Sequence, residues 1–215
     1  MRGNGRAERV FDIMNMRRAG SEVRSPQSGT MDVETATLRY LIYVLLPAWF
    51  LPGLLDWRMH RRTDIEHTSG TRESVLHLAM ISEVGAPLLM ALLLEINPPM
   101  LALMGGAALV HEATAMWDVR LAAHSTREVR PGEQNIHSFL ESMPFIAIGA
   151  AACLHPRQVR ALLRPPAGGR SWRLRRKRPP LPRRYLVGVL SAVTVLGVLP
   201  YFEELYRCWR AGRTR

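Results

Sequence analysis

Histidines and carboxylates recur four residues apart at several places in this 215-residue sequence. An interval of four puts both side chains on one side of an α-helix. Nitrogen and oxygen ligands presented together in this way suit iron, manganese or zinc. The groups with this spacing are Asp56 with His60, Glu73 with His77, and Glu133 with His137 and Glu141.

A further pair, His111 and Asp118, is spaced seven residues apart and so also shares one side of a helix. His111 and Glu112 lie within an apolar stretch, about 10 Å from its Asp118 end at the rise of an α-helix. An ionisable group in hydrocarbon costs about 2.5–3.5 kcal/mol even on the lenient insertion scale, so it usually faces a partner, a cavity or an ion. Glu83 is equally deep, but it points to another side of its helix than His77 and is expected to serve another contact.

These observations predict a metal site at one end of a helical bundle. Soluble di-iron bundles bind metal with similar groups that project inward from four helices. A metal-free polar network and unrelated surface roles are the alternatives. Glu203 and Glu204 could supply a further ligand or form ion pairs with Arg58, Arg61 or Arg62, and ion pairing is the favoured interpretation. The predicted ligands are Asp56, His60, Glu73, His77, His111, Asp118, His137 and Glu141.

The elements that must position these residues are apolar stretches that approach the roughly 20 residues needed to cross a bilayer. The mean hydropathy is near zero only because basic segments alternate with apolar ones. The sequence therefore predicts an all-α, polytopic transmembrane bundle of about five helices. The apolar stretches are Leu38–Trp57, Val75–Ile96, Pro99–Trp117, Phe139–Leu154 and Tyr185–Phe202.

Composition divides the chain into three parts. Residues 1–37 are a basic tail expected to be disordered, and Met31 is an alternative start. Residues 38–209 form the bundle, with a basic loop at 156–184, and residues 210–215 are a short tail.

Basic residues are unevenly distributed over the two ends of the expected bundle. Eighteen of the 29 belong to the end that carries the N-terminal tail and the 156–184 loop, which places the N-terminus in the cytoplasm. If translation starts at Met31, the two ends carry nearly equal numbers of basic residues, and the orientation is nearly undecided. The basic loop is expected to bind anionic lipid headgroups, and no zinc-finger, RRM or basic-helix pattern points to nucleic acid.

Four segments carry a resemblance to known proteins: LLDWRMHRRTDIEHTSGTRESVLH, HEATAMWDVR, RPGEQNIHSFLESMP and LPYFEELYRC. They resemble a group of small uncharacterised bacterial multi-pass membrane proteins over roughly residues 38–209. The resemblance implies a multi-pass protein of the bacterial inner membrane and no particular activity. A looser analogy links the histidine cluster to membrane di-iron hydroxylases and desaturases, although their HxxxH and HxxHH boxes do not occur here.

The leading hypothesis is therefore a metal-dependent oxidoreductase, di-iron-like, acting on a lipid-like or membrane-soluble substrate. A zinc-dependent membrane hydrolase with the same residues is the second. A non-catalytic membrane subunit or assembly factor is the third, and a membrane protein partner or a second copy of the chain would then dock on the polar cluster.

Overall fold

The computed structural model describes residues 32–126, 129–164 and 172–214, and within these ranges the regular elements are helices, as expected for an all-α protein. The chain divides into two compact units, residues 1–36 and 37–215. Most of the predicted tail, residues 1–31, lies outside the described ranges. The first helix of the described residues begins at Val33, before the predicted Leu38.

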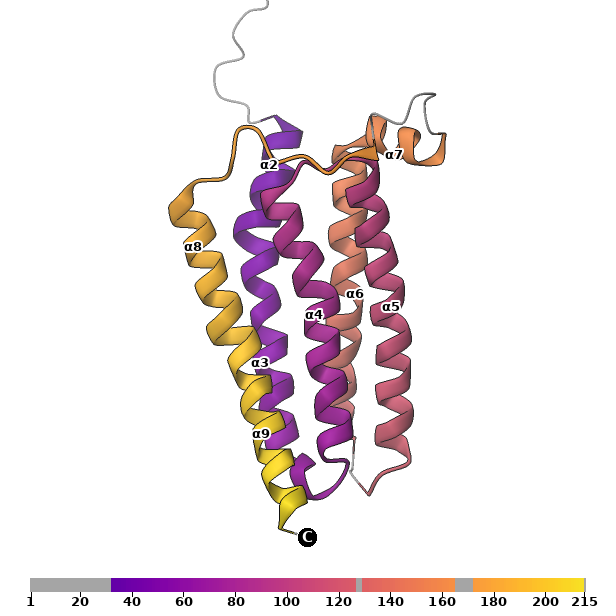
Figure 1. Cartoon of the computed structure of the whole chain (residues 1–215), viewed down its shortest axis with the longest axis vertical. Helices are drawn as coiled ribbons and strands as arrows, with labels where there is room; N and C mark the ends of the chain where they lie inside the picture. Colours follow the sequence, from indigo (N-terminus) through magenta and orange to yellow (C-terminus); the bar gives the residue numbers. More distant parts are fainter. Residues whose placement is uncertain (1–31, 127–128, 165–171, 215) are drawn as a thin grey trace, which may run out of the picture. The chain divides into compact units, whose positions relative to one another are not determined.

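Long helical rods form the second unit, and two of them contain a π-helical turn (Figure 1). The short elements are η2 (Ile65–His67) and α7 (Pro156–Leu163). The rods are α2 (Val33–Tyr40) with η1 (Leu41–Leu45) and α3 (Leu46–Arg62), α4 (Thr71–Leu93), α5 (Pro98–Ala123), α6 (Pro131–Leu154), and α8 (Arg183–Ala192) with η4 (Val193–Val198) and α9 (Leu199–Arg213).

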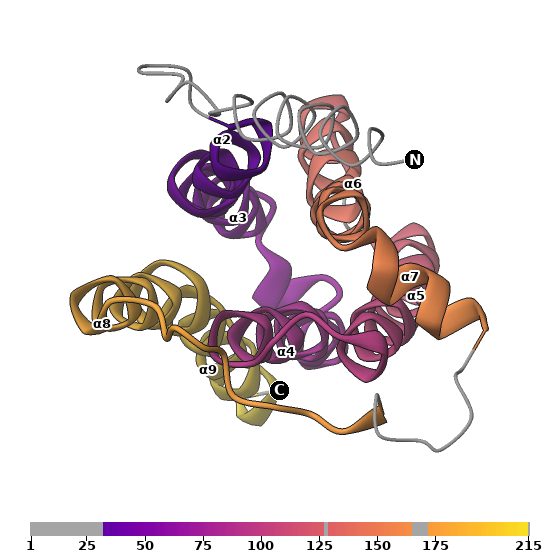
Figure 2. The same cartoon turned by 90° about the horizontal axis from the view of Figure 1, so that it is seen from above.

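The rods surround a common interior when the bundle is viewed along its axis (Figure 2). α3 packs against α6, α6 against α5, α5 against α4, and α4 against α9, which also contacts α3 and closes the ring. Away from the site, Leu46, Leu92 and Val189 fill the space between α3, α4 and α8.

Four of the rods are long and apolar enough to cross a membrane: Val33–Arg62, Thr71–Leu93, Pro131–Leu154 and Arg183–Arg213. α5 is at least as long as α4 and α6, and it contains polar residues, among them His111 and Asp118. α4 and α6 run in the same direction along the bundle, so α5 returns between them from one end to the other (Figure 1).

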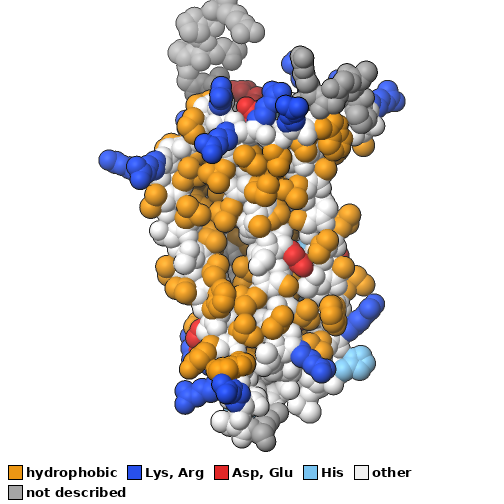
Figure 3. Space-filling view, in the orientation of Figure 1, with side chains coloured by type: hydrophobic (Ala, Val, Ile, Leu, Met, Phe, Trp, Pro, Cys, Tyr) orange, Lys and Arg blue, Asp and Glu red, His pale blue; other side chains and the backbone are white. Residues whose placement is uncertain are grey.

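The surface of the bundle has an apolar middle and charged ends (Figure 3). Large apolar side chains such as Leu51, Leu109 and Val187 are exposed along the helices, which is costly in water and favourable in lipid. Trp117 and Trp209 are exposed near the end where the chain terminates, at the level where aromatic side chains favour a membrane interface.

A strap formed by residues 172–182 crosses the opposite end of the bundle and pairs with the end of α4. The amide of Glu95 donates to the carbonyl of Arg175 over 2.9 Å, and the amide of Lys177 donates to the carbonyl of Leu93 over 2.9 Å. The Lys177 ammonium donates to the carbonyl of Ala91 over 2.8 Å. Burial lowers the pKa of Lys177 below its ordinary value. Part of the predicted loop is therefore fixed to the bundle.

Candidate metal centre

Polar side chains from every rod meet at the end of the bundle where α3, α5 and α9 finish and α4 and α6 begin (Figure 1). We call these residues the histidine–carboxylate cluster. All are buried except His137, which is partly exposed. The cluster consists of Asp56 and His60 from α3, Glu73 and His77 from α4, Asp118 from α5, Glu133 and His137 from α6, and Tyr201 and Glu204 from α9.

Two imidazoles stack at the centre of the cluster. The rings of His60 and His77 are nearly parallel, at 11°, and their centroids are 4.3 Å apart. A single carboxylate contacts both: Nδ1 of His60 lies 2.8 Å from one oxygen of Glu204, and Nδ1 of His77 lies 2.7 Å from the other. With Glu204 ionised, each Nδ1–H donates to it, and in the neutral form of each ring the Nε2 atom carries the lone pair.

The two Nε2 atoms face the remaining carboxylates and have no hydrogen-bond partner among the described residues. Nε2 of His60 lies 3.4 Å from Asp56 and 3.7 Å from Glu133. Nε2 of His77 lies 3.5 Å from Asp118 and 3.9 Å from Glu73. Each stacked ring therefore faces one pair of carboxylates, and the two pairs come from different helices.

These separations fit shared ligation of a metal ion better than hydrogen bonding. Ligand atoms that bind one ion at about 2.1 Å lie no more than about 4.2 Å apart. Two overlapping groups have ligand atoms within 4.8 Å of one another: Asp56, His60 and His137, and His60, Glu73 and His77. His60 belongs to both groups and has one ring nitrogen that is not bound to Glu204, so the two groups mark neighbouring candidate positions for an ion around this ring.

Asp56 is held in place from two sides. Nε2 of His137 lies 2.7 Å from one of its oxygens, and the Tyr201 hydroxyl donates to the other over 2.9 Å. The same hydroxyl lies 3.0 Å from the carbonyl oxygen of Gly53. These contacts fix the orientation of a candidate ligand, as outer partners do in characterised metal sites.

The charges of the cluster favour cations. Its five carboxylates outnumber its three imidazoles, so with all five ionised its own groups would carry a negative excess even with every ring protonated. A buried charge is costly unless it is paired or bound to metal. Glu73 and Glu133 also lie in the first turns of α4 and α6, where the helix dipole favours a carboxylate.

The structure brings together six of the eight predicted ligands: Asp56, His60, Glu73, His77, Asp118 and His137. The other two, His111 and Glu141, line a cavity beside the cluster. Nδ1 of His111 lies 3.7 Å from Glu83, which accepts a hydrogen bond from Thr114 over 2.8 Å. The expectation that Glu83 serves a separate contact is confirmed.

Sequence reasoning did not include Glu133, Tyr201 and Glu204 in the site. It placed Glu204 beyond the end of the last helix and expected an ion pair with arginine, which is wrong, because α9 continues to Arg213. Tyr201, Glu204 and Cys208 thereby share one buried helical face. The spacing of three and four residues between these positions is the sequence signal that could have identified this buried helical face.

The neighbouring Glu203, unlike Glu204, does contact an arginine, as the sequence analysis expected for both residues. Its carboxylate lies 3.5 Å from Arg61 and accepts a hydrogen bond from Trp57 over 3.0 Å. Asp64, Glu66 and His67 also lie close together, but this group is at the surface. There His67 contacts Asp64 over 2.7 Å, and Glu66 pairs with Arg207.

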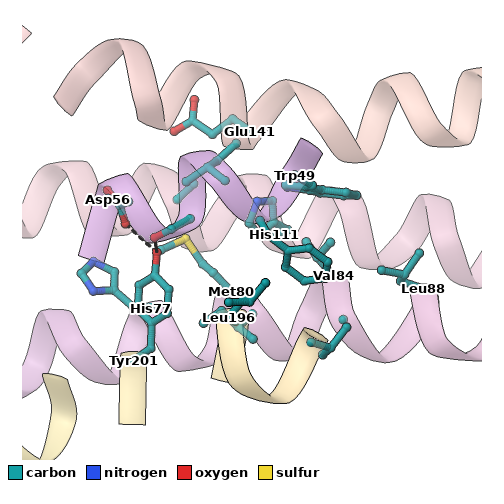
Figure 4. Close-up of a pocket in the computed structure, with 18 of the residues that line it drawn as sticks. Trp49, Asp56, His77, Met80, Val84, Leu88, His111, Glu141, Leu196 and Tyr201 are labelled. Atoms are coloured by element: carbon teal, nitrogen blue, oxygen red, sulfur yellow. Dashed lines mark hydrogen bonds between the residues drawn. The ribbon is translucent and has the colours of Figure 1, made fainter. Parts of the chain in front are cut away.

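A cavity of about 180 Å³ extends from the cluster along the bundle interior (Figure 4). Asp56, His77 and Tyr201 lie at one end of it and Leu88 at the other. The remaining walls are mainly apolar and are supplied by α3, α4, α5, α6 and η4, with His111 and Glu141 as the polar exceptions away from the cluster.

Comparisons with known proteins found no match to a protein-family model, to a curated protein or to a solved structure. The geometry of the cluster and its cavity therefore carries the functional argument.

Proposed function

We propose that the histidine–carboxylate cluster binds two divalent metal ions inside a membrane protein. The observation that carries this proposal is the stacked pair of imidazoles, both oriented through Nδ1 by Glu204, with both Nε2 atoms facing carboxylates. Metal-binding histidines usually donate their other ring nitrogen to a carboxylate in this way. The ring separation of 4.3 Å is close to the metal–metal distance of about 3.5–4 Å in two-metal sites.

The donor set favours iron or manganese. Carboxylate oxygens outnumber imidazole nitrogens, whereas structural zinc sites are usually four-coordinate and rich in nitrogen or sulfur ligands. In this assignment His60 with Asp56 and Glu133 would hold one ion, and His77 with Glu73 and Asp118 the other. His137 would complete the first position or orient Asp56.

The reaction that fits this centre is oxidation of a membrane-soluble substrate by dioxygen. Hydroxylation of one C–H bond consumes dioxygen, two electrons and two protons, and it yields C–OH and water. The electrons would come from an external donor such as a membrane quinol. The apolar cavity supports this assignment because it reaches the cluster and offers a mainly apolar lining to a membrane-soluble substrate.

The decisive experiment is elemental analysis of protein purified in mild detergent without chelators. We expect about two metal ions per chain in the wild type, and strong loss of metal in His60→Ala and His77→Ala. His124→Ala is the matched control, because the His124 ring is exposed at the same end of the bundle and contacts the Arg120 carbonyl instead of a carboxylate. Folded wild-type protein that binds no added iron, manganese or zinc would refute the metal centre and leave a proton-only polar network.

A zinc-dependent hydrolase is the second candidate, and one observation favours it. A separate cavity of about 240 Å³ reaches Asp118 and His137 from the side of Gln134, where the lining is more polar. Water entering there could be activated by a metal ion. Bound zinc, together with activity that is unchanged without dioxygen, would select the hydrolase.

We further infer that the chain lies in a bacterial inner membrane with its N-terminus in the cytoplasm. The excess of basic residues at the end that carries the strap supports this orientation, since basic loops are retained in the cytoplasm and attract anionic headgroups. In this orientation α5 crosses the membrane with its neighbours, and the cluster faces the opposite compartment.

A further inference from the structure

We propose that the cavity beside the cluster binds a single unbranched hydrocarbon chain. The cavity runs along α3 from Asp56 to Leu46 and along α4 from His77 to Leu88. At the rise of an α-helix these intervals correspond to about 15 Å. A volume of about 180 Å³ spread over this length makes the cavity narrow.

The volume excludes bulky ligands. A compact apolar cavity of about 150 Å³ holds one benzene molecule, and the cavity described here is only slightly larger but elongated. A methylene chain fits such a shape, whereas a sterol or a branched chain does not. Both sources of a methylene chain, a free fatty acid and the acyl chain of a phospholipid, are present in a membrane.

Three glycines keep the cavity open. Gly53 from α3, Gly85 from α4 and Gly197 from η4 line it, and a Cβ atom added at any of them would meet no heavy atom within 4 Å. Glycine inside a helix costs about 1 kcal/mol relative to alanine. Here the missing side chains on three separate helices leave room that a ligand can occupy.

The two ends of the cavity differ, and this difference orients the chain. One end is formed by Asp56, His77 and Tyr201 of the cluster, while Leu88 lies at the other (Figure 4). A bound chain therefore places one of its carbons beside the cluster. Binding of the chain does not depend on the proposed metal centre. The further step, that the carbon beside the cluster is the one that reacts, rests on that proposed centre.

Photolabelling of the full chain in lipid nanodiscs tests the proposal. The probe is a straight-chain fatty acid that carries a diazirine in the chain, and labelled residues are located by mass spectrometry. We expect labels on cavity residues such as Met80 and Leu196. Gly85→Leu and Gly197→Leu should each reduce cavity labelling about tenfold or more, because even one methylene group in an apolar pocket changes binding on this scale.

The matched controls are Gly106→Leu and Gly149→Leu. Both glycines also have open space around an added Cβ atom, but they are exposed and lie outside the cavity. These controls should label like the wild type. Gly85→Ala is the milder variant if leucine at this position prevents folding, and it should reduce labelling partially.

Competition and metal analysis complete the test. An unlabelled straight-chain fatty acid or a diacyl phospholipid should displace the probe, and whichever competes better identifies the source of the chain. A methyl-branched fatty acid should not compete. Labels confined to the outer surface, or equal labelling of Gly85→Leu and the wild type, would overturn the proposal. Cavity labelling in protein that binds no metal would retain the chain site and refute only the metal centre.

Discussion

At the scale of single residues, Glu204 is the side chain on which the geometry of the site depends most. One fully buried carboxylate fixes the tautomer and the orientation of two stacked imidazoles from two different helices. Its two oxygens are both used by ring nitrogens, and it therefore supports the ligands instead of binding an ion directly. A change at this position should alter both metal positions together.

We expect Glu204→Gln to lower metal affinity about 10–100-fold, the usual effect of losing an outer carboxylate partner of a histidine ligand. An amide presents one donor and one acceptor, so it cannot accept from both Nδ1–H groups. Titration of the apoprotein with iron or manganese measures the change. Glu203→Gln is the control, since Glu203 contacts Arg61 and Trp57 instead, and equal affinities of the two variants would contradict the assignment.

His111→Ala and Glu141→Ala should retain the metal content of the wild type. Both residues line the cavity, and His111 faces Glu83 instead of the stacked rings. Elemental analysis measures the metal content of these two variants and of His77→Ala in parallel. If either variant loses as much metal as His77→Ala, the substituted residue is a metal ligand, as the sequence analysis predicted.

Sequence spacing identified most of the cluster because a four-residue interval fixes two side chains relative to each other on one helix. It did not indicate which helical faces meet, and this is why His111 and Glu141 were included and Glu133 was left out. That information depends on the rotation of each helix in the bundle, which is set by packing between rods.

At the scale of the elements, the apolar stretches located the rods but not their ends. Hydropathy identifies the part of a helix that is suited to lipid, and a helix continues through polar residues where neighbouring rods still pack against it. α9 extends beyond the predicted Phe202 to Arg213, and α4 begins at Thr71 instead of Val75. The cluster is built from these polar helix ends, so hydropathy alone could not show it.

The strap is the other element that sequence analysis did not anticipate, and Lys177 tests how it is held. We expect Lys177→Met to lower the free energy of unfolding by about 1–2 kcal/mol, because the carbonyl of Ala91 loses a partly buried donor. Thermal unfolding in detergent measures the difference. Arg175→Met is the control, since the Arg175 side chain is exposed, and equal destabilisation by both changes would contradict the role of the ammonium.

The same lysine predicts a pH dependence. Its pKa is lowered by burial, so the unfolded chain binds the proton more tightly than the folded one, and the fold is less stable with Lys177 charged than with Lys177 neutral. Stability should therefore rise as the pH approaches the ordinary lysine pKa of about 10.4. Lys177→Met should lack this rise in stability with pH. Identical pH profiles of stability in the variant and the wild type would refute the prediction.

At the scale of the whole molecule, the directions of the rods determine which helix ends lie at the same end of the bundle. With α5 returning between α4 and α6, the two ends of the bundle lie on opposite faces of the membrane. Alkaline phosphatase fused after Arg213 in a bacterial host should therefore be active, and a fluorescent protein fused there should be dark. The reverse result would invert the proposed orientation.

The depth of the cluster decides how the protein would acquire its metal. The ligands lie within about three turns of the helix ends, so ions would arrive from the aqueous compartment on that face and not from the lipid. In the proposed orientation this compartment is the periplasm, beyond the reach of cytoplasmic iron stores and chaperones. Chelator that cannot cross the inner membrane, added to growing cells, should then yield protein without metal, whereas depletion of cytoplasmic iron alone should not.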